Sequence, residues 1–163
     1  MTVHIPSVVI RKKEIVGRKT AYDLMKEGIE EIMVCDLDSI IDGKTNFKLY
    51  NELSKFFEFT VFNLIFRVGD LVDSLVAGAS KVVVSPELTA DKLVSFLEIS
   101  QNVVDPNSSR FSLFQKSGGQ YVMVAGRMPY QNFSGVYNIG PSMGGDNIIN
   151  VDNFPAELNH FIT

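Results

Sequence analysis

The sequence has few of the residues and motifs that mark common cofactor, metal or hydrolase sites. Its single cysteine, Cys35, excludes an intramolecular disulfide and a cysteine-based metal site. The two histidines, His4 and His160, lie at opposite ends of the chain without a neighbouring Asp or Cys cluster. A Gly-x-Gly-x-x-Gly motif, a Walker-type phosphate loop and a Gly-x-Ser-x-Gly elbow are all missing. We therefore predict no metal site, no cofactor and no hydrolase triad.

Long apolar runs and an excess of positive charge are also missing. No apolar stretch approaches the ~20 residues that a helix needs to span a bilayer. A formal net charge of −4 argues against a nucleic-acid-binding protein, which usually has a basic stripe. The N-terminal stretch "MTVHIPSVVIRKKE" has its charges after a short apolar segment, the reverse of a secretory signal. We expect a cytoplasmic protein that binds neither nucleic acid nor membrane.

What the sequence does contain is typical of one globular domain. It has 163 residues, of which 45% are hydrophobic and 21% charged. A chain of this length can bury one sizeable core, and this composition disfavours disorder. We predict a single domain over residues 1–163.

Residues 1–100 alternate between strand and helix patterns. Apolar, β-branched runs at 8–10, 31–37, 59–66 and 81–85 predict buried strands. Each run is followed by an amphipathic or helix-forming stretch, such as "NFKLYNELSKFF" and "TADKLVSFLEIS". Four strand–helix units with short connections imply a parallel sheet with right-handed crossovers.

Residues 101–163 form a divergent remainder. In it, "RFSLFQKSGGQYVMVAGR" reads as two apolar runs joined by a glycine turn, which predicts an antiparallel hairpin near 111–126. A complete barrel typically takes ~250 residues and at least ~200. We therefore predict an α/β, TIM-barrel-like fold of (β/α) units that is shortened or incomplete. Exposed sheet edges could be covered by the tail from Pro129 onward or by a second copy, so a homodimer is a reasonable hypothesis.

Stretches within residues 3–127 resemble, in order, the strand motifs of one barrel family. They are "IPSVVIRKKEIV", "VCDLDSIIDGKTN", "FNLIFRVGDLVDSLVAGASKVVVS" and "SLFQKSGGQYVMVAGR". In that order they are similar to the first, the second, the third with the fourth, and the fifth strands of the HisA/HisF family. Its type member is the histidine-biosynthesis isomerase that acts on the phosphoribosylformimino-aminoimidazole-carboxamide nucleotide. The resemblance implies an eight-stranded barrel and a phosphorylated substrate.

The departures from the family pattern fall on its functional positions. Val9 and Phe114 stand where the family has its two catalytic aspartates, and neither side chain can transfer a proton. Residues 63–65 replace three glycines that let backbone N–H groups approach a phosphate. Ser85-Pro86 replaces a Gly-Thr pair. The pair Gly144–Gly145 could bind an anion, although a plain turn is the simpler interpretation.

Four polar residues remain as candidate ligand-binding residues. They are Asp36, Asp38, Asn46 and Arg67, placed by the resemblance at the C-terminal rim of the sheet, where such barrels bind their ligands. The structural alternative is that Asp36 and Arg67 pair with each other and hold the barrel mouth together.

Three functional hypotheses follow. The first is a divergent homologue that lacks isomerase activity and binds a small phosphorylated metabolite. The second is a structural or regulatory interaction protein whose pocket is filled, for example by Leu64, Phe66 and Phe114. The third is an active isomerase on a phosphoribosyl substrate that uses other carboxylates, such as those at positions 105, 146 or 152.

Overall fold

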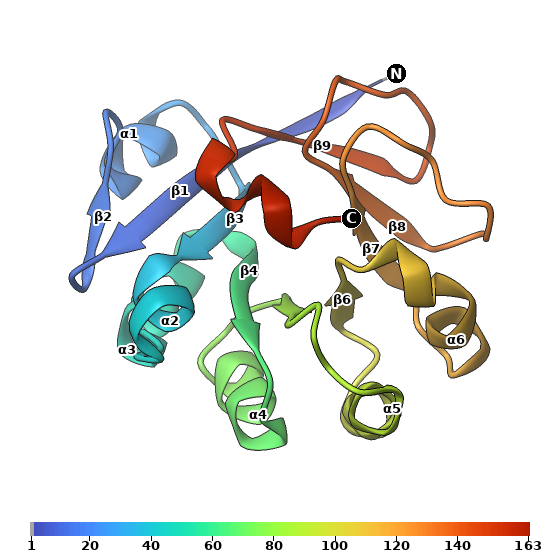
Figure 1. Cartoon of the computed structure of the whole chain (residues 1–163). Helices are drawn as coiled ribbons and strands as arrows, with labels where there is room; N and C mark the ends of the chain where they lie inside the picture. Colours follow the sequence, from blue (N-terminus) through green and yellow to red (C-terminus); the bar gives the residue numbers. More distant parts are fainter. Residues whose placement is uncertain (1) are drawn as a thin grey trace.

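The computed structural model describes residues 2–163, and its strands form a closed barrel (Figure 1). Each strand pairs in parallel with the next around the ring. The last strand pairs with the first, so the ring closes with eight strands. They are β1 (Val3–Arg11), β3 (Glu31–Asp36), β4 (Glu58–Ile65), β5 (Lys81–Val84), β6 (Val103–Asp105), β7 (Tyr121–Val124), β8 (Gly135–Asn138) and β9 (Ile148–Asp152). The predicted (β/α) barrel is confirmed, and it is short without being incomplete.

Strand β1 makes the closure because its two halves pair with different partners. Residues Val3–Pro6 pair with β9, and residues Ser7–Ile10 pair with β3. The ring itself has no free edge for the tail or a second copy to cover, and the unpaired side that remains among the described strands belongs to the three-residue strand β2 (Glu14–Val16), which pairs only with β1. The argument for a homodimer from exposed sheet edges therefore no longer holds, and the homodimer stays an untested prediction.

The helices surround the barrel, and Figure 1 shows them as an outer layer. They are α1 (Ala21–Lys26), α2 (Leu37–Asp42), α3 (Phe47–Ser54), α4 (Val68–Val76), α5 (Ala90–Ile99) and α6 (Phe111–Lys116), with the 3₁₀ helices η1 (Ser108–Arg110) and η2 (Ala156–Phe161). The connections from β7 to β8 and from β8 to β9 contain no helix. These loop-only connections explain how the barrel closes in so short a chain. None of the helices in the described part is long and apolar enough to cross a membrane.

The prediction of an antiparallel hairpin near 111–126 is wrong. Phe111–Lys116 is the helix α6, and Tyr121–Val124 is β7, which runs parallel to β6 and β8. Phe111 and Phe114 are both buried and lie three residues apart, on one face of a helical turn. The glycine turn "KSGGQ" ends this helix, with Gly118 in the left-handed region at φ 98°.

The antiparallel hairpin of this fold lies at the other end of the chain. Strand β2 (Glu14–Val16) pairs with the second half of β1, with Arg11 opposite Glu14. The two turn residues, Lys12 and Lys13, both have positive φ, 54° and 65°. Two consecutive left-handed residues are typical of a type I′ turn, for which Asn-Gly is the preferred sequence.

The apolar side chains form two cores, one on each side of the barrel wall. The outer core lies between strands and helices and includes Phe59, Phe96 and Phe114. The inner core fills the barrel and includes Cys35, Phe62 and other fully buried side chains. Inside the barrel the Thr60 hydroxyl donates a hydrogen bond of 3.0 Å to the Tyr137 hydroxyl and so joins β4 to β8. The barrel is therefore packed with its own side chains, as expected for eight strands.

The C-terminal segment covers one mouth of the barrel. In Figure 1 the red helix η2 lies over the middle of the ring. Leu158 and Ile162 belong to the inner core, and the half-buried Phe154 packs against it, with its ring edge to face with that of Phe62 at a centroid distance of 5.1 Å. The Thr163 amide donates to the Pro106 carbonyl at 3.1 Å, just beyond the end of β6. The covered mouth is thus the one at the C-terminal ends of the strands.

Two glycines in the connection from β8 to β9 give a matched test of this packing. A Cβ at Gly140 would lie 2.5 Å from the backbone nitrogen of Gly126, whereas a Cβ at Gly144 would meet nothing closer than 3.9 Å. We expect Gly140→Ala to lower the free energy of unfolding by about 1–3 kcal/mol, because backbone atoms cannot move aside. Gly144→Ala should change it by less than about 0.5 kcal/mol. Urea unfolding of both variants checks this, and equal effects would contradict the described loop.

Candidate functional site

Three of the four candidate residues come together at the C-terminal end of β3. Asp36 ends β3, Asp38 lies in the first turn of α2, and Asn46 precedes α3. The Asn46 side-chain amide donates to Asp36 at 2.8 Å and to Asp38 at 2.9 Å. The fourth, Arg67, is exposed at the start of α4, and no ion pair within residues 2–163 includes it.

The Asp36 carboxylate is fully buried, and neutral groups satisfy it. It accepts hydrogen bonds from the Ser39 amide at 3.2 Å, from the Asn46 amide at 3.0 Å and from the Tyr50 hydroxyl. The expected ion pair between Asp36 and Arg67 is therefore wrong. Asp36 instead holds the starts of α2 and α3 against the end of β3, which is a structural role.

Asp38 organises the hairpin turn between β1 and β2. Its carboxylate accepts the backbone N–H groups of Lys12 at 2.8 Å and Lys13 at 2.9 Å. It also accepts a bond of 3.1 Å from Arg11, whose guanidinium bonds Asp42 at 2.8 Å. These contacts hold the two lysines in the left-handed region, which side chains other than glycine seldom adopt.

The same contacts set the acidity of Asp38. Burial alone would raise its pKa, but hydrogen bonds from Asn46, from the Lys13 and Lys12 amides and from Arg11 outweigh burial and lower the pKa to about 2. Asp38 is therefore ionised at neutral pH and already occupied, so it is a poor general acid or base.

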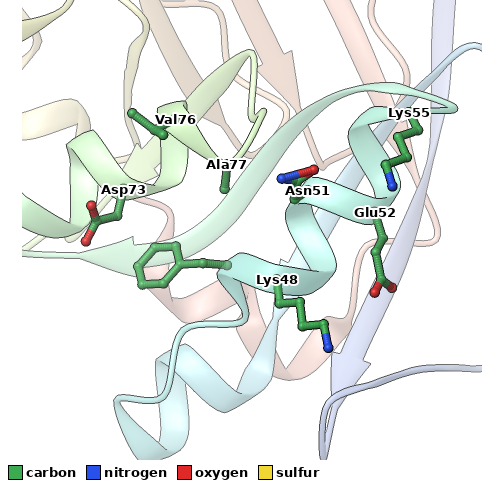
Figure 2. A pocket seen from close by; sticks show the side chains of 8 residues that line it. Lys48, Asn51, Glu52, Lys55, Asp73, Val76 and Ala77 are labelled. Carbon is green, nitrogen blue, oxygen red and sulfur yellow. The ribbon is translucent and has the colours of Figure 1, made fainter.

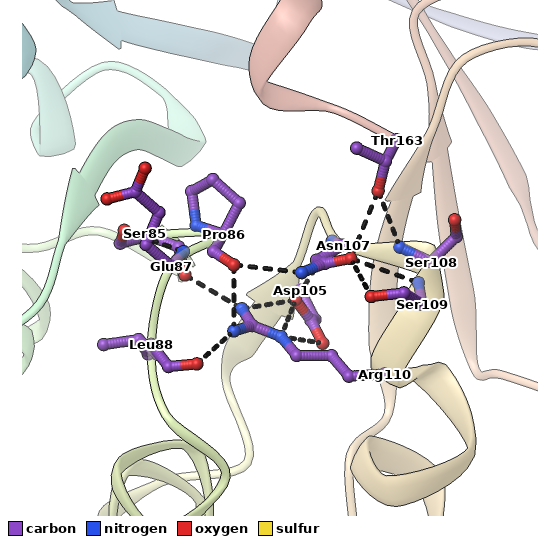
Figure 3. A network of polar contacts seen from close by, with 10 residues as sticks. All are labelled: Ser85, Pro86, Glu87, Leu88, Asp105, Asn107, Ser108, Ser109, Arg110 and Thr163. Carbon is purple, nitrogen blue, oxygen red and sulfur yellow. Dashed lines mark hydrogen bonds and ion pairs between the residues drawn. The ribbon is translucent and has the colours of Figure 1, made fainter.

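A second polar network lies at the end of β6 (Figure 3). The sequence offered its carboxylate, Asp105, as a possible catalytic group but did not predict its pairing with Arg110. The buried Asp105 carboxylate receives the Nε and an Nη of Arg110, with bonds of 2.8 to 3.0 Å. The other guanidinium N–H groups donate to the carbonyls of Ser85, Pro86 and Leu88. All five donors of Arg110 are thus used, which ties the loop after β5 to the loop after β6. Burial raises the pKa of Asp105 against the opposing effect of Arg110.

Of the two positions where the resemblance placed catalytic aspartates, only one lies on a strand of the barrel. Val9 lies on β1 beside the inner core, but Phe114 lies on α6 and not on a strand. The fifth strand of the ring is β6, and it ends with Asp105. An arginine five residues after the Asp was the available signal that this carboxylate is paired.

The positions that the resemblance assigned to phosphate binding do not form an open phosphate site in the structure. Leu64 has φ 50° at a register shift between β4 and β5 and points into the inner core. Phe66 is exposed and Phe114 lies in the outer core, so of the three residues expected to fill the barrel only Leu64 does so. At Gly145 the chain makes a turn closed by the Ile148 amide, at 3.2 Å from the Gly145 carbonyl. The glycine pair is thus a plain turn.

Outside the barrel, a groove of about 540 Å³ separates α3 from α4 (Figure 2). Lys48, Asn51 and Glu52 line it from α3, and Asp73 and Val76 from α4. Its charged groups are solvated and of both signs, so it has no arrangement suited to catalysis. In the described part of the chain no three His, Cys, Asp or Glu side chains gather as a metal site would require.

Comparison with known proteins identifies the fold and no family. Neither a family model nor a curated protein matches the chain. Among solved structures it is similar to 3-hexulose-6-phosphate synthase from Salmonella typhimurium, with a TM-score of 0.62 and 15% identity over 93% of this chain and 88% of that chain. At this identity the likeness shows the barrel fold alone.

The predicted membership of the histidine-biosynthesis isomerase family is wrong. The solved structure described above, 3-hexulose-6-phosphate synthase, is a different barrel enzyme, and no family model supports the assignment. The physical reason is that any parallel barrel repeats apolar strands that end in polar residues and glycines. The order of the quoted motifs was therefore a property of the fold.

The role of Asp38 can be tested by Asp38→Asn. The amide puts an N–H₂ group against backbone N–H donors, so we expect the free energy of unfolding to fall by about 1–3 kcal/mol at pH 7. The folded pKa of about 2 lies below the usual value, so the stabilisation is complete above pH ~4 and is lost as pH falls toward 2. Urea unfolding between pH 2 and 7 should show the two proteins converging at low pH. The exposed Asp146→Asn is the control, and a gap that stays constant with pH would contradict this role.

Proposed function

We propose that this protein is a binding protein built on a TIM-barrel scaffold and that the barrel mouth is not a catalytic site. The observation that carries the proposal is the closure of the mouth by the C-terminal segment. Phe154, Leu158 and Ile162 occupy the space above Phe62 and Leu64, within one apolar cluster. Barrel enzymes bind their substrates at this face, so a substrate would have to displace these side chains.

The state of the carboxylates also favours binding over acid–base catalysis. An acid and a base must reach the same substrate across an open space. Asp105 is fully buried against Arg110, and Asp152 is 2.9 Å from His4 in an ion pair or hydrogen bond on the surface. Asp146 is exposed on the connection from β8 to β9. The third hypothesis, an isomerase using these groups, is therefore less well supported than the second, an interaction protein with a filled pocket.

A small phosphorylated metabolite is the ligand class to test first, as in the first hypothesis. The name of the solved neighbour contains a sugar phosphate, and that barrel matches most of this chain. Such a ligand would bind outside the filled mouth. We also propose a cytoplasmic location, since the only cysteine is a free, buried thiol.

The buried thiol of Cys35 offers a direct test of mouth closure. Cys35 is the only cysteine, has 0% exposure and belongs to the inner core with Leu158. Burial raises its pKa, and the negative charges of Glu157, on η2, and Asp36 raise it further. A thiol reagent can therefore react only after the segment opens or the barrel unfolds.

We expect native Cys35 to react with Ellman's reagent at the rate set by global unfolding. Leu158→Ala should speed the reaction at least about tenfold, because removing a buried leucine weakens the cover by about 2–5 kcal/mol. Tyr130→Ala, at a fully exposed side chain, is the control and should leave the rate unchanged. A fast reaction in the native protein that is insensitive to urea would mean that the mouth opens freely, and the binding-only proposal would fail.

A further inference from the structure

A small pocket on the rim of the barrel, outside the closed mouth, is lined by four basic and two acidic side chains together with Thr45 and Asn46. It lies between the hairpin turn of β1 and β2 and the loop that joins α2 to α3, and its volume is about 270 Å³. Arg11, Lys12, Lys13 and Lys44 contribute its cationic groups. We call it the basic rim pocket. Positive charge is gathered here on a chain whose net charge is −4.

The two carboxylates of the pocket do not neutralise the lysines. The oxygens of Asp38 accept from Asn46, Arg11 and two backbone amides, and Asp42 is paired with Arg11. Within residues 2–163, none of the ion pairs closer than 4.0 Å includes the ammonium groups of Lys12, Lys13 or Lys44. Three ammonium groups thus remain for a ligand.

The turn that carries two of these lysines is not the one that local backbone preference would select. Both residues have positive φ, at 54° and 65°, where Asn-Gly would be unstrained. Both lysines are exposed, and neither belongs to or packs against the two apolar cores. The Asp38 carboxylate holds the strained turn in place by accepting hydrogen bonds from the backbone amides of both lysines. What the two lysines add to the molecule is their charge at the pocket.

The size of the pocket limits the ligand. A volume of about 270 Å³ is just below the ~300–1,000 Å³ typical of sites for drug-sized ligands. An adjoining groove of about 490 Å³ shares Lys13, Thr45 and Asn46 with it. The groove continues along α3, where Phe47, Lys48, Leu49 and the acidic Glu52 line it. A phosphate group fits the first space, and a small organic part fits the second.

We propose that the basic rim pocket binds the phosphate group of a small phosphorylated metabolite through Lys12, Lys13 and Lys44. This inference rests on the proposed binding function and says where on the molecule the ligand of that function binds. An ammonium group is a compact charge with three donors, which suits a phosphate dianion. Because these lysines are exposed, binding should weaken as ionic strength rises.

The test is calorimetric titration of the full chain with pyrophosphate and with ribose 5-phosphate at low and at physiological ionic strength. We expect saturable binding of at least one probe to a single site. Lys13→Gln/Lys44→Gln should weaken it tenfold or more. The control pair, Lys26→Gln/Lys116→Gln, changes the net charge equally at exposed lysines on α1 and α6 and should leave the affinity within about twofold.

Two results would overturn the inference. One is no saturable binding of either probe, and the other is an equal loss in both lysine pairs, which would mean non-specific attraction. The variant Leu158→Ala separates this failure from that of the proposed function. Binding that survives in Leu158→Ala but not in the Lys13/Lys44 pair supports the rim. Binding that responds to Leu158→Ala alone places the ligand in the mouth and overturns both proposals.

Discussion

The whole structure depends on the double pairing of β1, which joins the last strand of the barrel to the second. Residues Val3–Pro6 hold β9 and residues Ser7–Ile10 hold β3, so one strand of nine residues closes the ring. Closure removes the sheet edges and creates an interior that must be filled. The inner core fills it, and the C-terminal segment covers the mouth that remains. A short chain can thus complete a barrel by omitting helices from its last two connections.

The acidic residues at the strand ends serve this scaffold. Asp36, Asp38 and Asp105 lie at or just beyond the C-terminal ends of their strands, where barrel enzymes have their catalytic groups. Each is occupied by hydrogen bonds from the chain: Asp36 by neutral groups, Asp38 mainly by backbone amides and Asn46, and Asp105 by Arg110. A carboxylate whose oxygens already accept hydrogen bonds from the chain fixes the loops that donate them and is not available to a substrate. The three carboxylates therefore stabilise the loops at the C-terminal end of the barrel.

The sequence predicted the parallel barrel because apolar runs and helix patterns alternate over its first part. It also grouped Asp36, Asp38 and Asn46, which do meet, although their ligand-binding role stays untested. The hairpin near 111–126 failed because a two-turn helix with Phe111 and Phe114 on one face resembles a short strand when only apolar residues are counted. The cover by η2 depends on contacts between residues distant along the chain, which no local pattern reveals. The Asp105–Arg110 pair had a local signal in its spacing of five residues, but the bonds from Arg110 to the carbonyls after β5 had none.

Residues other than glycine have positive φ at Leu64, in the Lys12–Lys13 turn and at Asn153, and the first two sites differ in what offsets the strain. Leu64, at φ 50°, turns its side chain into the inner core, where it packs in one cluster with Leu158 and Ile162. Its neighbour Asn63 has a buried side-chain oxygen without a partner, a further local cost of the bulge. Burial in the core compensates for this strain. Lys12 and Lys13 have no such packing, since their side chains extend into solvent. Packing therefore compensates for the strain at Leu64, whereas the hydrogen bonds from the backbone amides of Lys12 and Lys13 to Asp38 hold the strained turn. The turn places both ammonium groups at the basic rim pocket, where the proposed phosphate would bind.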